Sequence, residues 1–260
     1  MKFFCVIGDP ISHSKSPRIH NNAIKLLGLN GIYTRFHLKD KEKLKESLFK
    51  LELNGANITL PFKEEALKIA DFKDYLAEQI GSANTLILKE NQIYAYNTDA
   101  PGFLKAIEEF KDVKKALILG AGGTARAIAY ALKQKNITSL IANRSEKNFA
   151  HFKNFNCVLY EDLKDFNFDL IINSTSAGLS DDYLPCDVNL LKKIQTKYAF
   201  EVIYGKKTPF IKFYEEKHIK HKDGLDMLLW QGVFAFELFF DLKNRQKQIQ
   251  KAMLEALNLS

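Results

Sequence analysis

The chain has 260 residues, a formal net charge of +7 and a pI near 9.1. That length exceeds the need of one mononucleotide-binding unit, so we expect two domains with sizeable cores. Most of the 38 cationic residues are lysines spread over several expected helices, which indicates solvated helix faces, and no Arg-rich or aromatic-interleaved basic run points to nucleic acid.

Cysteine spacing and hydropathy exclude further classes of protein. Cys5, Cys157 and Cys186 are widely spaced without a C-x-x-C pair, so we expect neither a disulfide framework nor a metal site. The apolar run at residues 3–7 is too short for a signal sequence, and no stretch reaches membrane-spanning length. The sequence therefore predicts a soluble, cytoplasmic protein that binds neither membranes nor nucleic acid.

The first hundred residues alternate between apolar strands and amphipathic helices. We expect strands at residues 2–8, 32–37 and 55–59, separated by helices at 17–28 and 41–51. A hairpin is expected at residues 82–88 and 92–96. The β-α-β-α-β order predicts an α/β domain with a mostly parallel sheet.

Hydroxyl groups are dense where the first strand ends. Ser14 and Ser16 lie in the loop that follows this strand, at the carboxyl end where open α/β sheets bind ligands. Ser16 also precedes Pro17, the first position of the next helix, so N-capping is an alternative role for Ser16.

Charged residues stand at the starts of two further helices. Lys63 follows Pro61 in the first turn of a helix, where a cation is unfavourable, so it is either solvated or kept for a partner or for chemistry at a lowered pKa. Asp99 precedes a helix expected at residues 101–110, and Thr98 or Asp99 could equally serve as its N-cap.

A glycine cluster lies between a strand expected at residues 116–119 and an alanine-rich helix expected at 124–132. Gly120 allows a sharp turn, and Gly122 lets a ligand approach the backbone closely. The free N–H groups at the start of the helix can then hold a pyrophosphate. The third glycine of the usual fingerprint is replaced by Ala125, which is still small enough for close packing.

The next strand, expected at residues 139–142, ends at Asn143, Arg144 and Ser145. An NAD site usually carries an acidic residue there to bind the ribose hydroxyls. A guanidinium suits a ribose phosphate instead, so NADP is favoured, with Lys147 as a second cation. The alternative is an ordinary helix start that Ser145 caps.

The last third of the chain predicts more elements of the same kind. Strands are expected at residues 169–173 and 198–203, and helices at 209–217 and 225–242. The helix at 225–242 is too apolar all round for a surface helix. Gln231 lies within this helix and is interpreted as a buried amide that the backbone satisfies.

Eight motifs occur in order along the chain. They are 8–17 (GDPISHSKSP), 57–63 (NITLPFK), 81–85 (GSANT), 97–99 (NTD), 120–123 (GAGG), 143–145 (NRS), 173–179 (NSTSAGL) and 224–231 (GLDMLLWQ). In this order they resemble the shikimate dehydrogenase family. The resemblance runs from the first residues to the last helices.

The resemblance implies a two-domain α/β fold. Residues 1–98 with 224–260 would form a substrate-binding domain, and residues 99–223 a Rossmann-like NADP-binding domain, with the active site in the cleft between them. It implies NADP-dependent, reversible reduction of 3-dehydroshikimate to shikimate in aromatic amino-acid biosynthesis, by a monomer or a homodimer.

The resemblance also assigns roles to residues. Lys63 and Asp99 would be the catalytic pair, and we favour Lys63 as the group that carries the proton. The substrate-binding residues would be Ser14, Ser16, Thr59, Lys63, Asn84, Asp99, Tyr204 and Gln231. The cofactor-binding residues would be Gly120, Ala121, Gly122, Gly123, Thr124, Asn143, Arg144, Ser145, Val202 and Gly224.

Some positions depart from the family's usual pattern. Ala95 stands where glycine is common, Glu201 stands where aspartate is usual, and Asn148 stands where a second phosphate-binding cation usually falls. Two alternatives to the implied function remain. A quinate/shikimate dehydrogenase that uses NAD would have the same fold, although Arg144 argues against it, and a non-catalytic nucleotide-binding sensor would not need the catalytic pair.

Overall fold

The computed structural model describes residues 1–258, which form two compact units. The first unit comprises Met1–Gly102 together with the chain from Leu229 onward, and the second comprises Phe103–Leu228. The points of division lie inside helices α5 (Asp99–Ala106) and α9 (Leu225–Phe240). The chain therefore passes from one unit to the other through helices.

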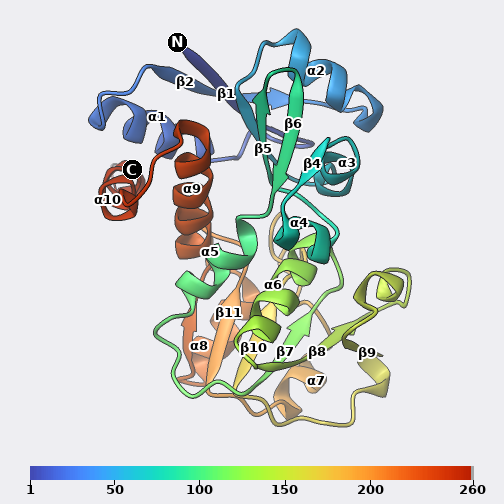
Figure 1. Ribbon diagram of the computed structural model, residues 1–260. Coiled ribbons are helices and arrows are strands. Elements are labelled where there is room, and N and C mark those ends of the chain that lie inside the picture. Colours follow the sequence, from blue (N-terminus) through green and yellow to red (C-terminus); the bar gives the residue numbers. More distant parts are fainter. Residues whose placement is uncertain (259–260) are drawn as a thin grey trace. The chain divides into compact units, whose positions relative to one another are not determined.

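The first unit contains a six-stranded sheet in the order β2-β1-β3-β5-β6-β4 (Figure 1). Its strands are β1 (Lys2–Gly8), β2 (Gly31–His37), β3 (Gly55–Ile58), β4 (Phe72–Lys73), β5 (Thr85–Lys89) and β6 (Gln92–Tyr96). Its helices, besides α5 and α9, are α1 (Ser16–Leu26), α2 (Leu44–Lys50) after a 3-10 turn at Lys41–Lys43, α3 (Lys63–Lys68), α4 (Tyr75–Ile80) and α10 (Gln246–Asn258). Only β5 among these strands pairs antiparallel with its neighbours, so the mostly parallel sheet is confirmed.

Strand β1 lies inside this sheet and is buried on both faces. Cys5 and Ile7 point into the cluster that α2, α3 and α4 cover, whereas the Phe4 ring packs at a tilt against Phe239 and Phe240 of α9. This alternation follows from the two-residue period of a strand. Because both faces are covered by helices, β1 reads as an almost unbroken apolar run.

The second unit contains a parallel sheet in the order β12-β11-β10-β7-β8-β9. Its strands are β7 (Lys115–Leu119), β8 (Thr138–Asn143), β9 (Asn156–Leu159), β10 (Leu170–Asn173), β11 (Tyr198–Glu201) and β12 (Lys220–Lys222). Its helices are α6 (Gly123–Gln134), α7 (Val188–Lys193) and α8 (Pro209–Glu216), with 3-10 turns at Phe149–Phe152 and Tyr160–Asp162. The strand order reverses between β7 and β10, so the loop after β7 lies at the point where doubly wound sheets bind ligands.

Several short helices and strands were not predicted from the sequence. They are β4, α4, β9, α7 and β12, none of which exceeds six residues. Elements this short offer too few periods for a helical or alternating pattern to be recognised. Among residues 1–258, no helix is both long enough and apolar enough to cross a bilayer.

The aromatic core of the first unit includes one histidine. His20 is 1% exposed, stacks on Tyr33 with ring centroids 4.2 Å apart, and lies near Phe236 and Phe239. Neither of its ring nitrogens has a hydrogen-bond partner within the described part of the chain. Burial lowers the pKa of His20 to about 3, so the ring is neutral at physiological pH.

We predict that His20 makes the protein sensitive to acid. A histidine with a lowered folded pKa contributes stability above its unfolded pKa near 6.5, and this contribution is lost as the pH falls toward about 3. The free energy of unfolding should therefore fall by about 2–3 kcal/mol between neutral pH and pH 4.5. His20→Phe should be at least as stable at neutral pH and should lack this loss in urea unfolding, whereas His151→Gln, at an exposed histidine, should keep it. An identical acid loss in His20→Phe would contradict this assignment.

Candidate active site

The centre of the candidate site is an ion pair in the first unit. The Lys63 ammonium donates to Asp99 Oδ2 at 2.7 Å, and the two side chains are only 11% and 10% exposed. Lys63 is the first residue of α3, and Asp99 is the first residue of α5. The alternative that Lys63 is simply solvated is therefore wrong, because its charge has a nearly buried partner.

The Asp99 carboxylate does not cap its own helix. Asn97 Oδ1 accepts from the backbone N–H groups of Asp99 and Ala100, at 3.1 and 3.3 Å. The expected N-cap at Thr98 or Asp99 is wrong, because the preceding asparagine satisfies these donors. The Asp99 carboxylate is therefore left to bind Lys63 and its other neighbours.

Asn84 holds the second oxygen of this carboxylate. Its amide nitrogen donates to Asp99 Oδ1 and to Thr98 Oγ1, both at 2.9 Å, and its amide oxygen accepts from the Thr98 N–H at 2.7 Å. Because both ends of the amide are bonded, its orientation is determined. Asn84 thereby fixes the position of the Asp99 carboxylate.

Gln231 reaches the same cluster from α9. Its Oε1 lies 3.5 Å from Asn84 Nδ2, and a Cβ atom at Gly102 would lie 2.8 Å from the Gln231 backbone nitrogen. Glycine is therefore needed where α5 and α9 approach each other. Gln231 is half-buried, where a buried amide was expected, and its Oε1 faces the Asn84 side chain.

Ser14 and Ser16 form a second buried polar group in the first unit. Both are 6% exposed, the Ser14 hydroxyl donates to Ser16 Oγ at 3.2 Å, and Ser14 Oγ accepts from the Ser16 N–H. The Arg35 guanidinium donates to the Ser14 carbonyl at 3.0 Å through Nε. Ser16 is already the first residue of α1, so the N-cap position falls on Lys15 and the expected cap at Ser16 is wrong.

Thr59 lies at the carboxyl end of β3, near the loop that carries the two serines. It follows β3, its N–H donates to the Ile7 carbonyl at 2.9 Å, and its methyl group would lie 2.4 Å from a Cβ atom at Gly8. Since β1 and β3 are parallel neighbours, the loops that carry Ser14 and Thr59 both follow the carboxyl ends of these strands, on the same side of the sheet.

Two residues that the sequence analysis did not assign connect these groups. The Tyr33 hydroxyl donates to Asn57 Oδ1 at 2.7 Å and also bonds Ser16, while Asn57 Nδ2 donates to the Asn84 carbonyl at 3.3 Å. Burial raises the pKa of Tyr33 well above its usual value, so the phenol stays protonated and can donate. The signal in the sequence was that Asn57 and Thr59 share one face of the strand expected at residues 55–59.

In the second unit, the glycine loop has the geometry that the motif predicts. Gly120 has φ +101°, and a Cβ atom there would lie 2.9 Å from Thr175 Cγ2 and 3.0 Å from Ser174 Oγ. A Cβ atom at Gly122 would have nothing within 4 Å, and no side chain caps α6. The N–H groups at the start of α6 are therefore approachable, which fits a pyrophosphate.

The end of β8 forms a turn instead of a helix start. Asn143 Nδ2 donates to the Ser145 carbonyl at 2.8 Å, and Arg144, Ser145 and Lys147 are exposed. The alternative in which Ser145 caps a helix is wrong, since the chain continues through a turn into the 3-10 segment Phe149–Phe152. The turn leaves the guanidinium of Arg144 accessible to an anion.

The loop after β11 carries Val202 and Tyr204. A Cβ atom at Gly224 would lie 2.0 Å from the Val202 carbonyl oxygen, so only glycine fits there. Gly224 N–H donates to the Ile203 carbonyl at 3.1 Å. This close contact holds Gly224 directly against the loop that precedes Tyr204.

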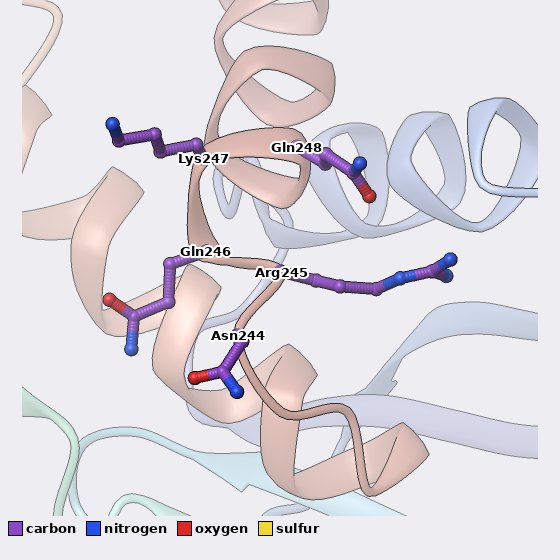
Figure 2. Close-up of a pocket in the computed structure, with 5 residues that line it drawn as sticks. All are labelled: Asn244, Arg245, Gln246, Lys247 and Gln248. Atoms are coloured by element: carbon purple, nitrogen blue, oxygen red, sulfur yellow. The ribbon is translucent and has the colours of Figure 1, made fainter.

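A pocket elsewhere on the molecule is unrelated to these residues. It has a volume of about 500 Å³ and is lined by residues 244–248 at the start of α10. Figure 2 shows that the side chains of Arg245 and Lys247 point away from each other, so they do not converge on one ligand position. Within residues 1–258, no group of three or more His, Cys, Asp or Glu side chains could hold a metal ion.

Comparison with known proteins identifies the family. Residues 6–86 match the "Shikimate dehydrogenase substrate binding domain", residues 104–180 match "Shikimate / quinate 5-dehydrogenase", and residues 224–254 match "Shikimate 5'-dehydrogenase C-terminal domain". The shikimate dehydrogenase (NADP(+)) of Helicobacter hepaticus is 44% identical over 95% of this chain and 94% of its own length. The chain belongs to the shikimate dehydrogenase family.

Other members of the shikimate dehydrogenase family share this fold over nearly their whole length. A shikimate dehydrogenase (NADP(+)) of Helicobacter pylori is 40% identical over 92% of each chain. The shikimate 5-dehydrogenase of Thermus thermophilus, solved in complex with NADP(H) and shikimate, superposes with a TM-score of 0.86 at 34% identity and covers 98% of this chain and 100% of its own. The two-domain α/β expectation is thus confirmed.

Proposed function

We propose that this chain catalyses the reversible, NADP-dependent reduction of 3-dehydroshikimate to shikimate, a step of aromatic amino-acid biosynthesis. The observation that carries the proposal is the nearly buried Lys63–Asp99 pair, oriented by Asn84, in a family whose relatives are shikimate dehydrogenases (NADP(+)). A nucleotide sensor would have no use for two charges held at this desolvation cost.

We assign the substrate to the first unit and the nucleotide to the second. The substrate residues of the first unit are Ser14, Ser16, Thr59, Lys63, Asn84, Asp99 and Gln231, with Tyr204 added from the loop after β11. The nucleotide residues are Gly120, Ala121, Gly122, Gly123, Thr124, Asn143, Arg144, Ser145, Val202 and Gly224. The open start of α6 and the exposed Arg144 support the assignment of a dinucleotide phosphate.

Lys63 is proposed as the acid–base group. Bound NADPH supplies the hydride, and the substrate's carbonyl oxygen must then gain a proton, or its hydroxyl must lose one in the reverse direction. Lys63 can transfer this proton through Nζ, while Asp99 holds the ammonium in place and can accept from the substrate hydroxyl.

The direct test is an assay of the purified protein with shikimate and each nucleotide. Reduction of NADP with little reduction of NAD is expected. Preferential reduction of NAD would support the quinate/shikimate dehydrogenase alternative, and nucleotide binding without any reduction would support the sensor.

Removal of the acid–base group should affect turnover more than binding. Lys63→Ala should lower kcat by roughly 10²–10⁴-fold, with a far smaller change in KM for shikimate, and Asp99→Asn should do similar damage. Because the residues act as a unit, the double variant should be little worse than the more damaging single variant. Lys68→Ala, at an exposed lysine of the same helix, is the control. A near-normal kcat in Lys63→Ala would exclude this role.

The two serines should act mainly in binding. If Ser14 and Ser16 donate to the substrate carboxylate equally in the ground state and in the transition state, replacing both by Ala should raise KM for shikimate much more than it lowers kcat. Affinity for NADP should hardly change. A fall in kcat at constant KM would instead assign this loop to orienting the catalytic pair.

Arg144 should determine the preference for NADP. Loss of its charge-assisted contact in Arg144→Asp should weaken NADP binding by roughly ten- to a hundredfold, equivalent to about 1.5–3 kcal/mol, and should favour NAD in relative terms. The ratio of kcat/KM for the two nucleotides measures this effect. Lys192→Asp, at an exposed lysine of α7, should leave the ratio unchanged, and an unchanged ratio in Arg144→Asp would remove it from the phosphate site.

A further inference from the structure

A fully buried carboxylate lies at the end of β11. Glu201 is 0% exposed, and its Oε2 accepts from Asn173 Nδ2 at 2.8 Å and from the Thr208 hydroxyl at 2.9 Å. Its Oε1 accepts from the Ile203 N–H at 3.0 Å. Burial raises the pKa of Glu201 to about 7, against these hydrogen bonds, which lower it. A carboxylate kept at this cost needs a structural or functional reason.

The partners of Glu201 stand on both sides of the loop that carries Tyr204. Ile203 immediately precedes Tyr204, and Thr208 ends the loop as the N-cap of α8, where its hydroxyl accepts from the Ile211 N–H. The Glu201 carboxylate therefore binds the loop near its beginning, at Ile203, and at its end, at Thr208. The path of residues 202–208 depends on it.

The third partner connects this loop to the glycine loop. While Asn173 Nδ2 donates to Glu201, Asn173 Oδ1 accepts from both the N–H and the hydroxyl of Thr175, at 3.0 and 2.7 Å. Thr175 in turn packs against Gly120, where no Cβ atom would fit. A continuous series of contacts thus runs from the turn of the proposed pyrophosphate site to the loop that bears Val202 and Tyr204.

We propose that Glu201 is a positioning residue, which holds the loop at residues 202–208 and with it Val202 and Tyr204, the residues proposed above to bind the nucleotide and the substrate. This inference rests on the proposed function of the same site. Glu201 touches neither ligand, and it acts through the loop that it fastens. Arg144, in contrast, is proposed to bind the adenosine phosphate of NADP directly.

The test is Glu201→Gln, assayed near pH 8, above the pKa of about 7 of the wild-type carboxyl group. The amide keeps the size of the side chain but replaces one acceptor oxygen by a donor that faces other donors. We expect kcat/KM for shikimate to fall by roughly ten- to a hundredfold and the Kd for NADPH, measured by its fluorescence, to rise. The Kd for adenosine 2′,5′-bisphosphate, which lacks the nicotinamide half, should stay within about twofold of wild type.

Matched variants separate positioning from general stability. Glu216→Gln removes an exposed carboxylate of α8 by the same substitution and should behave as wild type. Glu201→Asp keeps the charge and should recover part of the lost kcat/KM. If Glu201→Gln does not fold, Thr208→Val and Thr208→Ser test the same role. Only the valine variant removes a donor to the Glu201 carboxylate, so only this variant should show the fall in kcat/KM.

The outcomes are distinct from those of the proposed function. Wild-type protein without shikimate-dependent NADP reduction would overturn the function, whatever the variants do. An active wild type, with folded Glu201→Gln showing unchanged kcat/KM and unchanged NADPH affinity, would overturn the role of Glu201 alone. Equal weakening of NADPH and of adenosine 2′,5′-bisphosphate would also overturn it, since that pattern indicates a general loss of structure.

Discussion

The nearly buried pair of Lys63 and Asp99 is the constraint on which the first unit's polar architecture depends. Two charges removed from water are tolerable only when each is well bonded, because desolvation otherwise exceeds their attraction. Asp99 meets this condition through Lys63 on one oxygen and Asn84 on the other. Asn97 satisfies the helix N–H groups that the carboxylate would otherwise bind.

In the second unit, too, an asparagine side chain holds a buried carboxylate. Asn84 accepts a backbone N–H with its oxygen and presents its nitrogen to Asp99. Asn173 likewise accepts from the Thr175 N–H and presents its nitrogen to Glu201. A planar amide suits this task because its donor and acceptor are held rigidly apart, so fixing one end aims the other.

Helix starts account for most of the wrong expectations. Ser16, Thr98 and Ser145 all have the residue types of N-caps, yet none of them forms the expected cap. Whether such a residue caps depends on which residue first becomes helical and on which neighbour folds back, and a shift of one position changes the outcome. The Ser16 hydroxyl and the Asp99 carboxylate, which do not cap their helices, lie instead in the candidate site.

Local spacing by itself determined the strands with clear apolar periods, the glycine turn at Gly120 and Gly122, and the motifs that resemble one enzyme family. The family resemblance named Lys63 and Asp99 as a pair, but only the tertiary structure shows that the Lys63 ammonium contacts the Asp99 carboxylate, 36 residues away. Only the tertiary structure shows, too, that Glu201 is fully buried among hydrogen-bond donors. The physical reason is that a periodic pattern reports which face of an element is buried, whereas contacts between distant residues depend on which strands become neighbours.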